Sequence, residues 1–115
     1  MAKERSKKGR LHQVHRWLQA RFDTPYDTTL QVGSFKDFAG DCDRQGRRFV
    51  IRVSSRNTME VAIDYLMHEY AHAMVWPLAK LELREPDHPD EWGEAFAELY
   101  RTYRDLGGEL ESDLY

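Results

Sequence analysis

Two histidines stand four residues apart in the chain, with a glutamate directly after the first: His68, Glu69 and His72. On a helix, residues four apart lie on the same face, so both imidazoles can reach one cation. Imidazole nitrogens bind zinc at about 2.0 to 2.1 Å, and zinc lowers the pKa of a bound water towards about 7. A neighbouring carboxylate can take the proton from that water. The spacing therefore predicts a zinc site with Glu69 as general base.

A catalytic zinc ion takes three protein ligands and keeps one position open, so a third ligand is expected elsewhere. His88 is the first candidate, because the fifteen residues between it and His72 are enough for the chain to reverse direction. Pro89 follows it and suits the first turn of a helix. Glu94 and Glu98 are the alternatives, although the apolar spacing of the predicted helix around them favours their exposure to solvent.

The helix that carries the histidines is predicted to begin after residue 57 and to end at Pro77. Asn57 and Glu60, three positions apart, resemble a capping box at its start. Apolar residues flank the histidines on both sides, which predicts a site shielded from water. Pro77 is expected to end the helix, because proline lacks an N–H and clashes with the preceding turn.

Two further helices are predicted where apolar residues recur every three or four positions. The first covers Leu11 to Phe22 and is expected to end near Pro25. The second begins at Pro89 and is expected to close at the glycine pair 107–108. Its apolar face is formed by Trp92, Phe96, Leu99, Tyr103 and Leu106.

Strands are predicted between the first two helices. Residues 28–34 and 47–54 alternate apolar and polar types, and residues 35–43 are a candidate third strand. Residues 43–46, which end in glycine, have the composition of a hairpin turn. The predicted fold is therefore α+β: an N-terminal helix, a small, about three-stranded antiparallel or mixed sheet, an active-site helix and a C-terminal helix.

The composition is that of an ordinary soluble domain. The chain has 115 residues, a formal net charge of -3, 41% apolar residues and 32% charged residues. This length predicts one domain. The longest apolar run, residues 73–79, is too short to cross a membrane. The basic N-terminus is not followed by the hydrophobic segment of a secretory signal, so we expect a cytoplasmic protein.

The charges are distributed unevenly. Five basic residues stand within residues 1–10, and eleven acidic residues stand within residues 82–115. Residues 1–9 are expected to form a flexible basic arm before a single domain over residues 10–115. The arm is a candidate for DNA contact, although short charged termini are more often only solvated. The lone Cys42 cannot form an intramolecular disulfide and is expected to be a semi-buried filler.

Four other polar residues are weaker candidates. Tyr70, Tyr100 and Tyr103 could each donate a hydrogen bond to a developing oxyanion, but buried tyrosines more often belong to the core. Asp64 precedes His68 by one helical turn and could orient its imidazole, although an acid on the helix surface is the commoner explanation.

The run from Leu66 to Ala73, followed by His88-Pro89-Asp90-Glu91-Trp92-Gly93, resembles the SprT-like (Spartan-type) zinc metallopeptidase family. That family has a third histidine ligand after the active-site helix, followed by an aromatic residue, and His88 and Trp92 match these positions. Residues 39–42 and 49–54 resemble the glycine-containing turn and the strand before its active-site helix. The resemblance covers roughly residues 11–104 and implies a zincin fold that cleaves peptide bonds.

The chain departs from that family at two points. Pro89 replaces the glycine that follows the third histidine, and the cysteine-rich zinc ribbon that often follows the family's protease core is not in this sequence. Residues 93–98 also resemble the helix of lethal-factor-like gluzincins, in which a glutamate is the third ligand.

The sequence thus predicts a zinc-dependent metalloendopeptidase that acts on protein or peptide substrates. Zn²⁺ is expected to be held by His68, His72 and His88, with Glu69 as the catalytic residue. One alternative is a gluzincin-type peptidase with Glu94 or Glu98 as third ligand. The other is a catalytically inactive module that binds zinc or DNA.

Overall fold

The computed structural model describes the backbone of residues 6–82 and 90–114, and the side chains of residues 6–75 and 92–105. In these residues, three helices and a three-stranded mixed sheet confirm the predicted α+β class. No helix in this part of the chain has both the length and the apolar character needed to cross a membrane. The elements are α1 (Lys7–Arg21), β1 (Asp27–Gly33), β2 (Gly40–Gln45), β3 (Arg48–Ser54), α2 (Met59–Glu82) and α3 (Asp90–Leu114).

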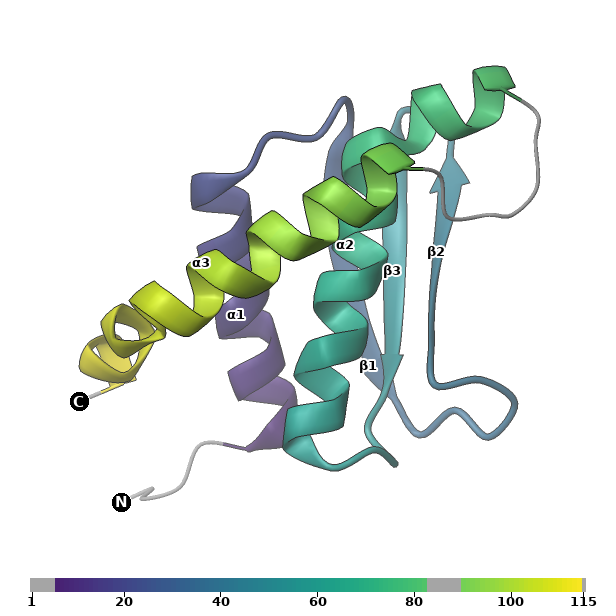
Figure 1. The fold of residues 1–115 in the computed structure, drawn as a ribbon. Coiled ribbons are helices and arrows are strands. Elements are labelled where there is room, and N and C mark those ends of the chain that lie inside the picture. Colours follow the sequence, from purple (N-terminus) through teal and green to yellow (C-terminus); the bar gives the residue numbers. More distant parts are fainter. Residues whose placement is uncertain (1–5, 83–89, 115) are drawn as a thin grey trace.

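The elements form three layers (Figure 1). The sheet is one outer layer, α1 and α2 lie next to each other on one of its faces, and α3 crosses both helices on the side away from the sheet. α1 contacts β1, whereas α2 contacts β2 and β3. One cluster of buried apolar side chains includes residues from all three layers. The helix with the two histidines, α2, is therefore packed on both sides.

β3 is the central strand of the sheet, with β1 and β2 at its edges. β1 runs parallel to β3, and β2 runs antiparallel to it. Phe49, Ile51 and Val53 alternate along β3 and are completely buried, as their spacing predicts. The outer edge of β2 has no strand partner in the described part of the chain.

The hairpin between β2 and β3 turns at residues 46–47. Gly46 has a φ of 65°, a left-handed conformation that glycine adopts without steric cost. The predicted turn at residues 43–46 overlaps the observed turn only at Gly46, because residues 43–45 belong to β2. β2 begins at residue 40 rather than near Phe35. Phe35 and Phe38 instead form a loop in which their rings stack at 4.8 Å, beneath the guanidinium of Arg52.

The expected flexible arm is too long at its C-terminal end, because residues 7–9 are helical. The side chain of Ser6 caps α1 by accepting a hydrogen bond from the Gly9 N–H at 3.0 Å. Lys7 Nζ donates to the carbonyl oxygens of Ser55 and Asn57, at 2.9 and 2.6 Å. These bonds connect the start of α1 to the segment before α2.

The cap of α2 also differs from the prediction. Thr58 precedes the helix, and its Oγ1 accepts a hydrogen bond from the N–H of Val61 at 3.3 Å. The side chain of Asn57 does not cap the helix in this way, because its amide donates to the carbonyls of Ala39 and Ser54. The predicted capping box at Asn57 is therefore wrong by one residue.

Two helices continue past their predicted ends. α2 passes through Pro77 and ends at Glu82, and its last turns bend away from its first part (Figure 1). A proline inside a helix removes one N–H and displaces the turn before it, so it can bend a helix without ending it. α3 passes through residues 107–108 to Leu114. Glycine lowers helix stability by about 1 kcal/mol relative to alanine but keeps its N–H, which permits continuation.

Candidate metal site

The two histidines of α2 lie next to each other, as their spacing requires. The ring centroids of His68 and His72 are 4.9 Å apart, and both side chains are half-buried. One ligand atom from each of His68, Glu69 and His72 lies within 4.8 Å of the other two. The arrangement can hold a single cation between imidazole nitrogens, with a carboxylate beside it.

Glu69 is the acidic member of this group and its most buried side chain, with 6% of its surface exposed. Burial raises the pKa of its carboxyl to about 7, and the negative charge of Asp41 adds to this increase. A carboxyl group with a pKa near 7 can accept and return a proton at neutral pH. The protein thus places its candidate general base where its proton affinity suits that role.

Aromatic side chains of α3 pack against both imidazoles. The indole N–H of Trp92 donates to the backbone oxygen of His68 at 3.3 Å. Its ring centroid lies 4.9 Å from that of His68 and 5.4 Å from that of His72. Phe96 stacks on Trp92 at 5.2 Å and 4°, and its centroid is 6.1 Å from that of His68. These contacts restrict the rotation of the rings that would bind a metal.

The edge strand β2 approaches α2 closely because residue 40 is glycine. A Cβ at Gly40 would lie 3.3 Å from Tyr65 Cβ and 3.3 Å from the backbone oxygen of Arg52. A larger residue would therefore push β2 away from the helix. The neighbouring Asp41 lies opposite Arg52 in the sheet and forms an ion pair with it.

Cys42 lies on the side of β2 that packs against the core. Burial raises the pKa of its thiol to about 12, and the charge of Glu69 adds to the effect. The side chain is partly exposed and is a free thiol. A thiol with this pKa stays protonated at neutral pH, which confirms the prediction of a semi-buried filler.

The candidates for the third ligand lie in different parts of the chain. His88 lies outside the described residues. Glu94 and Glu98 are both exposed on α3, as the apolar spacing predicts. Among the described side chains, the group able to hold a metal comprises His68, Glu69 and His72, and neither of the α3 glutamates belongs to it.

The tyrosines differ in their surroundings. Tyr70 is 1% exposed, and its hydroxyl donates to the backbone oxygen of Phe22 at 2.7 Å. It is therefore a core residue with a satisfied hydroxyl, as expected. Tyr103 is half-buried and accepts a hydrogen bond from Arg10 at 3.4 Å. Tyr100 is 47% exposed.

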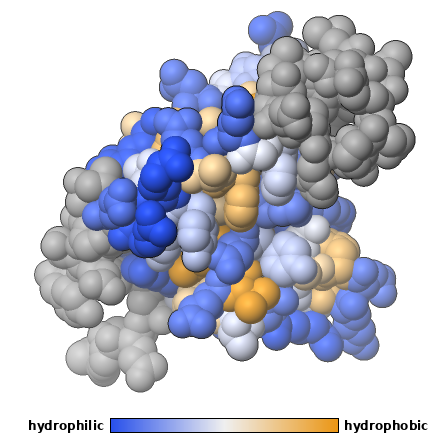
Figure 2. Space-filling view, viewed as in Figure 1, coloured by the Kyte–Doolittle hydropathy of each residue, from blue (hydrophilic) through white to orange (hydrophobic). Residues whose placement is uncertain are grey.

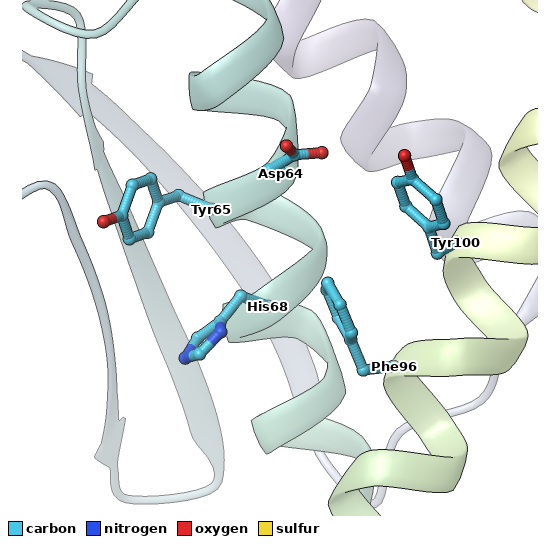
Figure 3. A pocket seen from close by; sticks show the side chains of 5 residues that line it. All are labelled: Asp64, Tyr65, His68, Phe96 and Tyr100. Atoms are coloured by element: carbon cyan, nitrogen blue, oxygen red, sulfur yellow. The ribbon is translucent and has the colours of Figure 1, made fainter.

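A cleft of about 480 Å³ opens beside His68, between α2 and α3 (Figure 3). The Asp64 carboxylate points from α2 towards Tyr100 on α3 and away from the His68 ring. This orientation agrees with an acid on the helix surface rather than one that orients the imidazole. The side chains that line the cleft are Asp64, Tyr65, His68, Phe96 and Tyr100.

The contributions of β2 and of the cleft were not found from the sequence. The HExxH pattern lies within one helical turn and can be read directly from its spacing. Asp41, by contrast, raises the pKa of a residue 28 positions away, and only the folded chain brings the two together. The glycine at residue 40, inside the candidate strand 35–43, was the one local signal of a close approach.

No protein-family model matches this chain. No curated protein and no solved structure matches it either. The function therefore has to be inferred from the geometry of the described residues and from the motif that His68, Glu69 and His72 form.

Proposed function

We propose that this protein is a zinc-dependent metallopeptidase of the SprT-like type, which hydrolyses peptide bonds in cytoplasmic protein or peptide substrates. One observation carries the proposal. Two half-buried imidazoles and one buried carboxylate offer ligand atoms within 4.8 Å of one another on a single helix. This combination fits zinc chemistry and general base catalysis at the same place.

The donor set suits zinc, because neutral imidazole nitrogens are among its preferred ligands. The contacts of Trp92 with both imidazoles hold the ligand rings from the side of α3. Such supporting contacts orient the ligands of metal sites. A zinc ion bound here would act as a Lewis acid, polarising the peptide carbonyl and lowering the pKa of water.

In this mechanism Glu69 moves the proton. Its carboxylate takes a proton from the water that attacks the carbonyl carbon of the peptide. The bond between that carbon and the amide nitrogen then breaks, and Glu69 returns the proton to the departing amine. With 6% of its surface exposed, the side chain is shielded from bulk solvent.

His88 is the third ligand in this proposal. α3 begins at Asp90, and Trp92 in its first turn contacts both imidazoles. His88 stands four residues before Trp92 in the sequence, and four residues span at most about 14 Å. The exposure of Glu94 and Glu98 favours the histidine over either glutamate.

Zinc stoichiometry and hydrolysis together test the proposal. We expect about one zinc ion per chain in the wild type by elemental mass spectrometry, and a marked loss of zinc in His88→Ala. Glu69→Gln should keep the zinc and lower the cleavage of a fluorescent casein by about 100- to 10,000-fold. Asp27→Asn, which changes an exposed carboxylate at the start of β1, is the control.

Other results would identify the alternatives. Full zinc in His88→Ala, with loss of zinc in Glu94→Gln or Glu98→Gln, would establish a gluzincin-type site. Zinc binding without casein cleavage, together with DNA binding that weakens steeply with salt, would establish an inactive zinc- and DNA-binding module. Absence of zinc from the wild type would refute the metal site itself.

A further inference from the structure

The cleft beside His68 combines one carboxylate with aromatic rings. Asp64 and His68 stand four residues apart on α2, which is about 6 Å along the helix axis. Phe96 and Tyr100 stand one turn apart on α3, with their rings stacked at 6.2 Å. The cleft therefore extends along α2 from the candidate metal site to the Asp64 carboxylate (Figure 3).

This combination has the chemistry of a cation site. A carboxylate accepts charge-assisted hydrogen bonds from an ammonium or a guanidinium group. Aromatic rings attract the same cations through their electron-rich faces and pack against the long apolar stems of lysine and arginine. Figure 2 shows apolar surface in the middle of this face of the molecule, bordered by hydrophilic surface.

Within the described part of the chain, no cation pairs with the Asp64 carboxylate. Partial burial raises the pKa of Asp64 above its ordinary value, and the charge of Glu60 adds to the increase. A neighbouring lysine or arginine would have lowered this pKa. Among the described side chains, the Asp64 carboxylate thus has no cation paired with it.

We propose that this cleft is a specificity site that binds a lysine or arginine side chain of the substrate, next to the peptide bond that is cut. The inference depends on the proposed peptidase function, because the scissile bond must lie at His68 and His72. From there a long basic side chain can follow α2 and place its cation between Asp64 and Tyr100. A substrate residue with a carboxylate would instead be repelled by Asp64 and Glu60.

Stacking of nucleic-acid bases is the competing use of exposed aromatic rings. The stacking of Trp92 and Phe96 on each other at 5.2 Å and 4° leaves less of the Phe96 ring open to a flat base. The acidic groups Asp64 and Glu60 also oppose a phosphate backbone. The chemistry of this cleft therefore favours a basic peptide.

Substrate selectivity tests the proposal directly. Cleavage sites in unfolded casein are first mapped by mass spectrometry. Peptides are then built around one site that differ in one residue beside the cut: lysine, arginine, norleucine or glutamate. For the zinc-loaded wild type we expect kcat/KM to be at least tenfold higher for lysine than for norleucine, and lowest for glutamate.

Two variants separate the cleft from general effects of charge. Asp64→Asn should reduce the ratio of lysine to norleucine kcat/KM to about one, and Asp64→Lys should make glutamate the preferred residue. Asp27→Asn removes the same charge from an exposed position on β1 and should keep the wild-type ratio. Asp64 is exposed, so neither of its variants should unfold the protein.

The proposal is overturned if the wild type cleaves all four peptides equally, or if Asp64→Asn keeps the lysine preference. Either result would leave the peptidase function intact.

If the wild type cleaves nothing, the peptidase proposal fails, and a binding experiment then tests the cation site in the cleft. Nuclear magnetic resonance titration of zinc-loaded Glu69→Gln should then show tighter binding of the lysine than of the norleucine peptide, and Asp64→Asn should abolish the difference. Equal binding, or displacement of the lysine peptide by a single-stranded oligonucleotide, would refute the cation site.

Discussion

Folding places the Glu69 carboxyl where its charge is unfavourable. The side chain is 6% exposed, and Asp41 adds a second negative charge nearby, so the pKa rises from 4.5 to about 7. A pKa unit corresponds to 1.36 kcal/mol, and this shift therefore corresponds to about 3 kcal/mol. A residue that lowers stability in this way is expected where function requires it.

Replacing Glu69 by glutamine should stabilise the metal-free protein at alkaline pH. The folded-state pKa is raised, so the contribution of Glu69 to stability is complete below about pH 4.5 and is lost as the pH rises through about 7. Glutamine does not titrate. In chelator, we expect Glu69→Gln to be about 2 to 3 kcal/mol more stable than the wild type at pH 8.

Urea unfolding at pH 4.5 and pH 8 measures this difference. At pH 4.5 the two proteins should differ little, because the wild-type carboxyl is then largely protonated in the folded state. The same difference at both pH values would show that packing, not charge, distinguishes the two side chains.

At the scale of elements, α1 is joined to β1 through a buried histidine. His15 is 5% exposed, and its Nε2 lies 2.8 Å from the hydroxyl oxygen of Thr28. The side-chain amide of Gln19 donates to the backbone oxygen of the same threonine at 3.1 Å. Burial, with smaller contributions from His12 and Arg16, lowers the pKa of His15 to about 4.

This lowered pKa makes the joint between α1 and β1 sensitive to acid. Protonation of His15 favours the unfolded state, in which its pKa is 6.5, so the contribution of neutral His15 to stability is complete above that value and is lost as the pH falls to about 4. His15→Gln replaces the imidazole near Thr28 by an amide, which can form hydrogen bonds but cannot titrate. Relative to this variant, the wild type should lose about 3 kcal/mol of unfolding free energy between pH 7 and pH 4.

Chemical unfolding of the two proteins in chelator, at pH 7, 5.5 and 4, gives this difference. The comparison cancels the opposite contribution of Glu69, which both proteins contain. Unfolding free energies that change in parallel for the wild type and His15→Gln would show that His15 does not titrate in this range.

Helices and their buried faces could be predicted because apolar residues repeat along them with the helical period. Their ends could not be predicted, since a proline or a glycine weakens a helix without always ending it. Pro77 and the glycine pair 107–108 are such residues, and both helices continue through them. Likewise, Asn57 has capping chemistry, but its amide is taken by the carbonyls of Ala39 and Ser54.

In the candidate site, too, one part could be predicted from the sequence and another part could not. The group of His68, Glu69 and His72 lies within one turn of α2, so its spacing alone predicts it. The contacts from α3 and β2 join residues more than twenty positions apart, and no local pattern reveals them. Trp92 illustrates this point, because its spacing predicts a buried helix face but not contact with two imidazoles.

At the scale of the whole molecule, α2 lies between the sheet and α3, and the core cluster includes residues of all three layers. A ligand that binds α2 therefore stabilises the element on which the other layers pack. Ligand binding to the folded state alone adds about 2.7 kcal/mol when the ligand is present at 100 times its Kd.

Zinc should consequently raise the melting temperature of the metal-free protein. At roughly 4 °C per kcal/mol for a domain of this size, zinc at 100 times its Kd should raise Tm by about 10 °C. Differential scanning calorimetry with increasing zinc measures the shift. The double variant His68→Ala, His72→Ala should show none, and an equal shift in that variant would place the zinc elsewhere.

The exposed edge of β2 has a consequence for the behaviour of the protein at high concentration. An unpaired strand edge can add the strand of another molecule and so start aggregation. In β2, Asp41, Asp43, Arg44 and Gln45 keep polar side chains along this edge, and a neighbouring molecule would have to remove their water to pair with it. We therefore expect concentrated solutions to remain clear while these residues are kept, and β-branched apolar substitutions in β2 to cause precipitation without loss of the native fold.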